Sequence, residues 1–98
     1  MVKNVLISFK AFGPMRRLLQ KGMLELKMSE GSTVRDVIDD VLLIGGEELA
    51  KLVLHQGEVS GNLIVLLNRR DVRTLENELD TEVTDGDQLT LLPHVQGG

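Results

Sequence analysis

The chain has 98 residues, no cysteine, two aromatic residues and a net charge of −4. A single domain of this size, 42% apolar, can bury a core unaided, while the absence of cysteine excludes a disulfide framework, a thiolate nucleophile and a cysteine-ligated cluster. The acidic charge and scarce aromatics argue against nucleic-acid binding, and no apolar stretch is long enough for a membrane span or a signal peptide, so we expect a soluble, cytoplasmic protein.

Two segments near the N-terminus have the alternating pattern of β-strands. Apolar side chains recur at every second position in Val5, Ile7 and Phe9, and the same period appears over residues 24–28. Gly13-Pro14 ends the first segment because proline lacks a backbone N–H. We expect the two strands to form a hairpin with a long polar loop.

The next segment predicts the main helix. Its apolar residues, from Val34 to Leu42, recur at the spacing i, i+3, i+4, i+7 and i+8. Thr33 can cap this helix together with Asp36, and Gly45-Gly46 ends it. A second helical stretch is expected over residues 47–55, with His55 near its end as a surface histidine stabilised by the helix dipole.

The second half of the chain predicts three more strands. Residues 63–67 are apolar on both faces, which is typical of a central strand, and residues 68–71 turn into a short strand around Val72. Asp85-Gly86-Asp87 is a turn signal before a last strand over residues 88–92. This order predicts an α+β domain with a mixed sheet of four to five strands around one main helix, plus a short second helix.

The last residues carry the clearest chemical signal. Pro93 cannot continue a sheet ladder and should release the chain from its strand, which divides the protein into a domain (residues 1–93) and a flexible tail (residues 94–98). Two terminal glycines can enter a channel too narrow for other residues and leave the terminal carbonyl open to attack. Because an ionised carboxylate is a poor electrophile, another enzyme must activate it.

The tail, the turn before its strand and the order of elements together resemble the ubiquitin-like β-grasp proteins of the MoaD and ThiS family. The ending Leu91-Leu92-Pro93-His94-Val95-Gln96-Gly97-Gly98 is similar to the family ending hydrophobic-Pro-Pro-Val-x-Gly-Gly, and Asn68-Arg69-Arg70-Asp71-Val72 is similar to the family's Asn-Gly-Arg-Asp hairpin. His94 and Gln96 depart from that ending, and the segment 43–61 lengthens the chain relative to compact members. Small archaeal modifier proteins also resemble this chain.

The resemblance implies a carrier or modifier protein and not a catalyst. A ubiquitin-activating-type enzyme would use ATP to adenylate the Gly98 carboxylate, so the chain itself would bind no cofactor and no metal. A sulfur donor would then form a thiocarboxylate for molybdopterin, thiamine or transfer RNA thiolation, or a lysine of a target protein would be conjugated. The implied partners are the activating enzyme, the large subunit of molybdopterin synthase (with this chain as the small subunit) and target lysines, and the free protein is expected to be a monomer.

The last two apolar strands also predict a docking surface. Their faces exceed what one helix can cover, so we expect an exposed patch that includes Leu66, Leu92 and Pro93. The alternative is that the second helix and the loops cover these side chains.

Other charged residues have two open interpretations. Arg69, Arg70 and Arg73 form a basic cluster that is either an ordinary solvated turn or a surface that steers the chain toward an acidic partner. For His94, a contact inside the partner's channel is favoured over catalysis, because a tail residue is poorly held for proton transfer.

A different class of function is a β-grasp module that docks non-covalently and whose tail is incidental.

Overall fold

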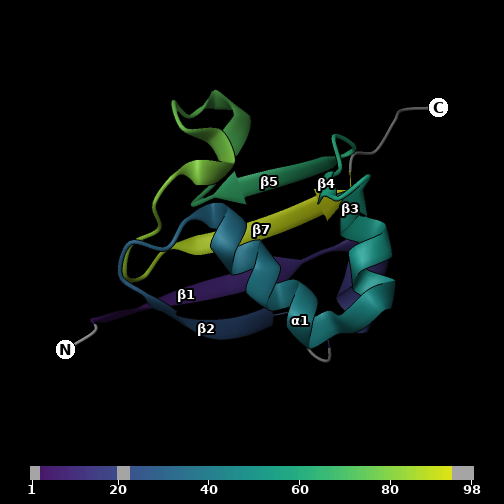
Figure 1. The fold of residues 1–98 in the computed structure, drawn as a ribbon, viewed down its shortest axis with the longest axis horizontal. Helices are drawn as coiled ribbons and strands as arrows, with labels where there is room; N and C mark the ends of the chain where they lie inside the picture. The colour runs from purple at the N-terminus through teal and green to yellow at the C-terminus, as the bar shows by residue number, and fades with distance from the viewer. Residues whose placement is uncertain (1–2, 20–22, 94–98) are drawn as a thin grey trace.

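The computed structural model describes residues 3–19 and 23–93, and it contains one five-stranded sheet with a helix across one face (Figure 1). The elements in chain order are β1 (Asn4–Ala11), η1 (Gly13–Leu18), β2 (Met23–Ser29), α1 (Val34–Val53), β3 (Leu54–His55), β4 (Glu58–Val59), β5 (Leu63–Leu67), β6 (Arg70–Asp71), η2 (Val72–Thr74), η3 (Glu78–Asp80) and β7 (Gln88–Pro93). The expected α+β architecture is confirmed. No helix within the described ranges is long and apolar enough to span a membrane.

The sheet is mixed and has the strand order β2-β1-β7-β5-β6. Only β1 and β7 run parallel, and every other pair in it is antiparallel. The middle position therefore belongs to β7. Residues 63–67, predicted as a central strand, form β5, an interior strand between β7 and the two-residue β6. The short strand expected around Val72 is β6, which ends one residue earlier, at Asp71, and Val72 itself begins η2. There the Asp71 carboxylate accepts a hydrogen bond from the Arg73 N–H at 2.9 Å, which turns the chain into η2.

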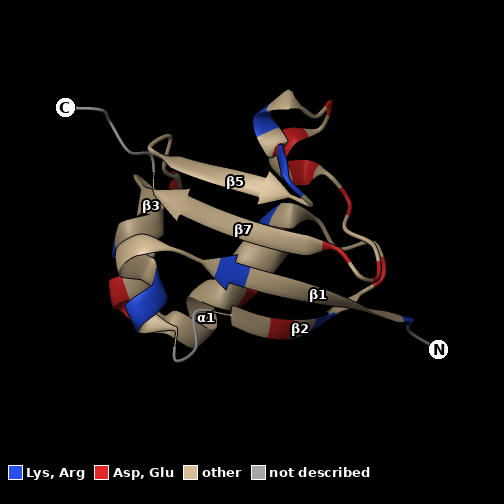
Figure 2. Ribbon diagram, turned by 180° about the vertical axis from the view of Figure 1, so that it is seen from behind, with Lys and Arg blue, Asp and Glu red and all other residues tan. Residues whose placement is uncertain are grey.

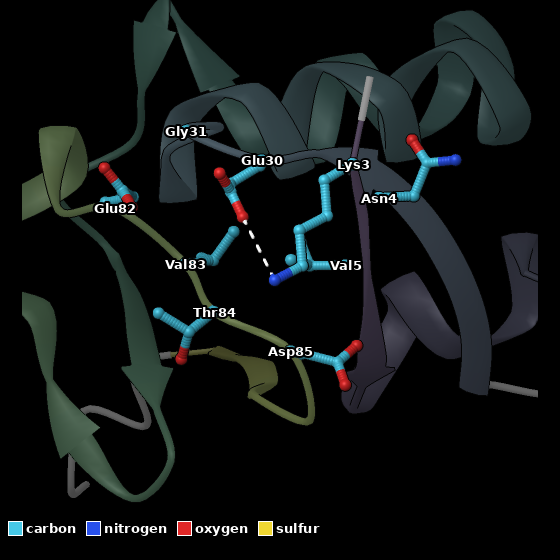
Figure 3. Close-up of a pocket in the computed structure, with 9 residues that line it drawn as sticks. All are labelled: Lys3, Asn4, Val5, Glu30, Gly31, Glu82, Val83, Thr84 and Asp85. Atoms are coloured by element: carbon cyan, nitrogen blue, oxygen red, sulfur yellow. Dashed lines mark ion pairs between the residues drawn. The ribbon is translucent and has the colours of Figure 1, made fainter. Parts of the chain in front are cut away.

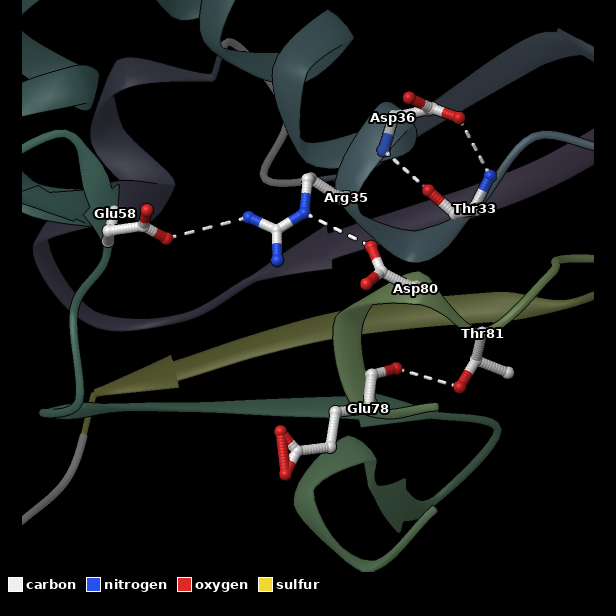
Figure 4. Close-up of polar contacts among 7 residues, drawn as sticks. All are labelled: Thr33, Arg35, Asp36, Glu58, Glu78, Asp80 and Thr81. Atoms are coloured by element: carbon white, nitrogen blue, oxygen red, sulfur yellow. Dashed lines mark hydrogen bonds and ion pairs between the residues drawn. The ribbon is translucent and has the colours of Figure 1, made fainter. Parts of the chain in front are cut away.

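Helix α1 begins at the cap predicted from the sequence. The Thr33 hydroxyl accepts a bond from the Asp36 N–H at 3.3 Å, and the Asp36 carboxylate accepts one from the Thr33 N–H at 3.0 Å (Figure 4). Gly46, at φ 80°, breaks the helical path where the diglycine predicted an end, and a second helical part then runs to Val53. His55 is exposed in β3, just past this second part.

The core lies between α1 and the face of the sheet that α1 covers. Phe9 and Leu89 of the sheet and Val37 and Val41 of the helix are fully buried and belong to one hydrophobic cluster. Arg35 of α1 forms ion pairs with two other elements of the fold, with Asp80 of η3 at 3.3 Å and with Glu58 of β4 at 3.6 Å (Figure 4). In the part of the chain that the structure describes, no helix lies over the opposite face of the sheet (Figure 2).

Candidate functional site

The candidate site is the uncovered face of the sheet, called here the open face. Side chains alternate between the two faces of a strand, so the residues next to each core residue point away from α1. The open face includes Leu6, Ser8 and Lys10 of β1, Thr90 and Leu92 of β7, and Ile64 and Leu66 of β5. Glu25 and Lys27 of β2 and Asp71 of β6 lie on the same face, opposite Ser8, Leu6 and Leu66.

Three of these residues form an apolar cluster near the end of β7. Ile64 is directly opposite Leu92, and Leu66 is the next open-face residue along β5. All three side chains are half-buried, although none of the described helices covers them. A partly exposed apolar cluster on an uncovered sheet is a surface from which a partner protein can exclude water when it binds.

A cation lies beside this cluster. Lys10 is opposite Thr90, and its Nζ is 5.3 Å from the centroid of the Phe12 ring. A cation over an aromatic face at this distance is attracted to the ring. The open face therefore presents apolar side chains and a positive charge close to the point where β7 ends.

Pro93 does not leave the sheet as the sequence predicted. It is the last residue of β7 and is opposite Leu63 in the β5 ladder. The Asn68 N–H donates to the Gln88 carbonyl at 2.8 Å, which makes the Leu63/Pro93 pair a non-hydrogen-bonded one. The backbone nitrogen of Pro93 points away from β5, so a proline here costs that ladder no hydrogen bond.

The Pro93 ring packs against the turn that follows β1. A Cβ added to Gly13 would lie 2.8 Å from Cγ of Pro93, closer than such atoms approach each other. Gly13 also has a φ of 68°, in the left-handed region that favours glycine. Gly13 thus leaves room for the ring of Pro93, at the end of β7. Since Pro93 shares its face with Leu63, it lies on the opposite face from Leu92.

The predicted basic cluster lies at the other end of β5. Arg69 and Arg70 are exposed and belong to the hairpin between β5 and β6. The Asn68 side chain holds this hairpin against the start of β7, donating to Asp87 at 2.8 Å and accepting from the Gln88 N–H at 2.9 Å. The structure therefore does not bring Arg69 and Arg70 to Leu92 and Pro93, since the length of β5 separates them.

Arg73 is held by Asp71. Its guanidinium Nη2 lies 3.2 Å from the Asp71 carboxylate. The hydrogen bonds from the side chain and backbone N–H of Arg73 lower the pKa of Asp71, and the same side-chain bond raises the pKa of Arg73. Arg73 is therefore paired within its own turn.

The remaining predicted site residues, His94, Val95, Gln96, Gly97 and Gly98, lie outside the described residues. Sequence reasoning in turn missed Ile64, Thr90 and Lys10. The signal was available for Ile64, because the strict alternation of residues 63–67 gives it the same face as Leu66. For Lys10 and Thr90 it was not, since only the register of β1 on β7 places them beside that cluster.

A hollow of about 510 Å³ lies at the opposite end of the sheet (Figure 3). It is lined by Lys3, Asn4, Val5, Glu30, Gly31, Glu82, Val83, Thr84 and Asp85. Lys3 and Glu30 form an ion pair across it at 3.8 Å, and Asp85 accepts a hydrogen bond from the Leu6 N–H at 2.7 Å. Among the described residues there is no group of three or more potential ligands that could hold a metal ion. The hollow is thus separate from the end of β7.

Comparison with known proteins places the fold and the family. The sequence pattern of the ThiS family matches residues 10–98. A protein of Archaeoglobus fulgidus, named as a candidate sulfur carrier, is 36% identical over 80 residues, which are 82% of this chain and 89% of the relative. The solution structure of small archaeal modifier protein 1 from Methanosarcina acetivorans superposes with a TM-score of 0.82 at 25% identity, over 98% of this chain and 99% of that one.

A third similar structure comes from an assembly. A chain in the BexX/CysO complex of Amycolatopsis orientalis is 30% identical, with a TM-score of 0.68 over 94% of this chain and 99% of that chain. These structural similarities confirm the ubiquitin-like β-grasp fold. The chain belongs to the ThiS family, a family of sulfur carriers and ubiquitin-like modifiers and not of catalysts.

Proposed function

We propose that this protein is a carrier whose Gly98 carboxylate is activated by a ubiquitin-activating-type enzyme. The observation that carries this proposal is that the ThiS family match continues past the end of β7 through Gly98. The candidate sulfur carrier of Archaeoglobus fulgidus and the modifier protein of Methanosarcina acetivorans support a transfer function.

The proposed chemistry has two steps. A carboxylate oxygen of Gly98 attacks the α-phosphorus of ATP and pyrophosphate leaves, which gives an acyl adenylate. Hydrosulfide from a sulfur donor then attacks the carbonyl carbon and AMP leaves, which gives a thiocarboxylate. Alternatively a lysine amine attacks, AMP leaves and the nitrogen loses a proton, which gives an isopeptide bond. A glycine at the reacting position, with another before it, leaves the carbonyl carbon sterically open in both reactions. No side chain of the carrier has to act as an acid or base.

The open face is the proposed docking surface for the activating enzyme. Leu92, Ile64 and Leu66 are half-buried without a described helix over them, and β7 leads from Leu92 directly toward the tail. The five residues after Pro93 can span at most about 18 Å, so the adenylating centre must lie within that distance of the end of β7. An enzyme that covers the apolar cluster is in position to receive the tail.

Removal of Gly97 and Gly98 tests the activation step. The truncated chain and the full chain are each incubated with the activating enzyme and ATP, and the product is read by mass spectrometry. We expect the adenylate only on the full chain, while circular dichroism shows the same folded domain for both. Formation of the adenylate without the two glycines would refute the proposal.

A matched pair of open-face variants tests the docking surface. Leu92→Arg places a charge in the apolar cluster, and Leu6→Arg places the same charge at the other end of the open face, where the side chain is 51% exposed. We expect Leu92→Arg to raise the KM for activation by about tenfold or more, and Leu6→Arg to have little effect. Equal KM values for the two variants would place docking elsewhere.

The two transfer products are distinguished by mass. Sulfur carriage gives a carrier with one oxygen exchanged for sulfur at Gly98, and protein modification gives branched peptides on target lysines. The second candidate function is a non-covalent binding module, which the uncovered apolar cluster itself favours. In that case a partner would bind the truncated chain as tightly as the full chain, and neither product would form.

A further inference from the structure

Strand β2 forms an outer edge of the sheet. Its only sheet neighbour among the described strands is β1, along the whole register from Asn4/Ser29 to Lys10/Met23 (Figure 1). Because the strand is seven residues long, its other side presents a long row of backbone groups. An edge of this kind is a template for pairing with another extended segment.

The backbone groups that point outward can be assigned from the register. The Glu30 N–H donates to the Lys3 carbonyl at 2.8 Å, so every second pair from there, through Leu26/Ile7, is hydrogen-bonded toward β1. The N–H and C=O groups of Glu25 and Lys27 therefore point away from β1. Outside the strand ladders, no backbone hydrogen bond among the described residues uses them.

The side chains of the same two residues carry opposite charges on the open face. Glu25 is opposite Ser8 on β1 and Lys27 is opposite Leu6, so neither has a charged partner across that ladder. Both side chains are exposed, and neither forms an ion pair with another described residue. The edge thus presents one negative and one positive side chain, two residues apart, with unpaired backbone beside each.

We propose that β2 pairs antiparallel with β2 of a second copy of this chain, about a two-fold axis at Leu26. In this register Glu25 of each copy is opposite Lys27 of the other, and both belong to hydrogen-bonded pairs that use the outward groups. Leu24 is opposite Met28 of the second copy, and these side chains lie on the face that α1 covers. The result is one continuous sheet that runs through both copies.

The charges select this register over its neighbours. A shift by two residues in one direction places Glu25 opposite Glu25 of the second copy, and a shift in the other direction places Lys27 opposite Lys27. Like charges directly opposite each other destabilise a strand pair, whereas opposite charges stabilise it. Only the register centred on Leu26 satisfies both side chains.

The pairing leaves the proposed docking surface free. The apolar cluster of Leu92, Ile64 and Leu66 lies on β7 and β5, on the other side of β1 from the new interface. The sequence predicts a monomeric free protein, whereas this proposal predicts a weak, concentration-dependent dimer. The inference does not rest on the proposed activation of Gly98, because it uses only the edge of β2.

Charge exchange across the interface tests the dimer. Sedimentation velocity is measured on the full chain from about 20 μM to about 1 mM for the wild type, Glu25→Lys, Lys27→Glu and the double variant with both changes. Each single variant creates two like-charged pairs, and we expect at least about tenfold weaker association. The double variant restores two opposite-charged pairs and should associate like the wild type.

Net charge provides an internal control. Glu25→Lys changes the net charge from −4 to −2, since one negative charge becomes positive, and general repulsion between copies therefore decreases. Weaker association of this variant can then arise only from the local pairing. An equimolar mixture of the two single variants should form a heterodimer, because one copy then carries lysine at both positions and the other carries glutamate at both.

Three outcomes would overturn the inference. These are a wild type that stays monomeric up to about 1 mM, single variants that associate as strongly as the wild type, and a mixture that gains no association. Circular dichroism of each variant shows whether the fold is intact, and both substituted positions are exposed.

Discussion

The two faces of this sheet are built from the same strands but have different surroundings. In β1, Ile7 is 1% exposed beneath α1, while its neighbour Leu6 is 51% exposed on the open face. In β5, Val65 is buried and Ile64 and Leu66 are half-buried. Apolar character alone therefore does not mark the core of this protein. The covered face supplies stability, and the open face leaves apolar area available to a partner.

The end of β7 shows the same contrast within two residues. Leu92 belongs to the open face, whereas Pro93 lies opposite Leu63 on the other face and packs against Gly13. Leu92 thus contributes to the open face, whereas Pro93, the next residue, contacts the turn after β1.

The largest predicted effect is a difference in stability between variants of two neighbouring residues of β1, one on each face of the sheet. Ile7→Ala opens a cavity under α1 and should lower the free energy of unfolding by about 2–5 kcal/mol. Leu6→Ala should change it by about 0.5 kcal/mol or less, because the side chain is already exposed. Urea denaturation of both variants gives the comparison. Similar losses for the two would mean that the open face is also part of the stabilising core.

A pair of glycine variants measures the contact that fixes Pro93. Gly13 and Gly86 both have positive φ, at 68° and 88°, but an added Cβ meets the Pro93 ring only at Gly13 and meets nothing within 4 Å at Gly86. Gly86→Ala should cost about 1–2 kcal/mol of backbone strain. Gly13→Ala should cost about 1–3 kcal/mol more, from the clash with Pro93.

The readout for this pair is thermal or urea unfolding, together with the NMR shifts of Leu92. Those shifts should move in Gly13→Ala and stay unchanged in Gly86→Ala. Equal losses of stability and an unmoved Leu92 would show that the Pro93 ring is free to step aside.

A smaller effect is expected at the cap of the helix that covers the buried face. Thr33→Ala removes the acceptor for the Asp36 N–H and should lower the free energy of unfolding by about 1 kcal/mol. Thr33→Ser keeps the hydroxyl and should therefore retain most of the stability that the cap contributes. Amide hydrogen exchange in the first turn of α1 should become faster in the alanine variant alone, and faster exchange in both would point to the lost methyl group.

The smallest effect is expected for the ion pair between Asp71 and Arg73. Asp71 is opposite Leu66, and the hydrogen bonds from Arg73 lower its pKa. A lowered pKa means that this pair stabilises the fold above the ordinary pKa of the carboxyl group, and that the contribution is lost as the pH falls through the lowered value. Asp71→Asn should therefore reduce stability slightly at neutral pH and flatten the acid side of the stability curve.

Urea unfolding of Asp71→Asn and the wild type at a series of acidic pH values checks this sign. The difference between the two proteins should shrink toward low pH. A difference that stays constant would show that the asparagine affects the turn itself and not the ionisation.

Much of the fold could be predicted because local physics decides it. The cap at Thr33 and Asp36 and the break at Gly45-Gly46 follow from short-range bonding and backbone strain. The alternation in β1 and β2 likewise follows from one covered face. The place of Pro93 within β7 could not be predicted. A proline is tolerated there because its nitrogen points away from β5, and only the register between β5 and β7 decides that direction. The turn at Val72 was missed because the side chain of Asp71 competes with strand pairing.

By itself, the sequence determined the class of the fold, its main helix and, through its ending and its likeness to one family, a transfer function proposed for Gly98. Only the tertiary structure decided which apolar side chains stay uncovered, which strand is central and which edge is free. The physical reason is that strand register joins residues far apart in the chain, such as Lys10 with Thr90 and Leu92 with Ile64. Periodicity assigns a side chain to a face, but only this pairing determines its neighbours there.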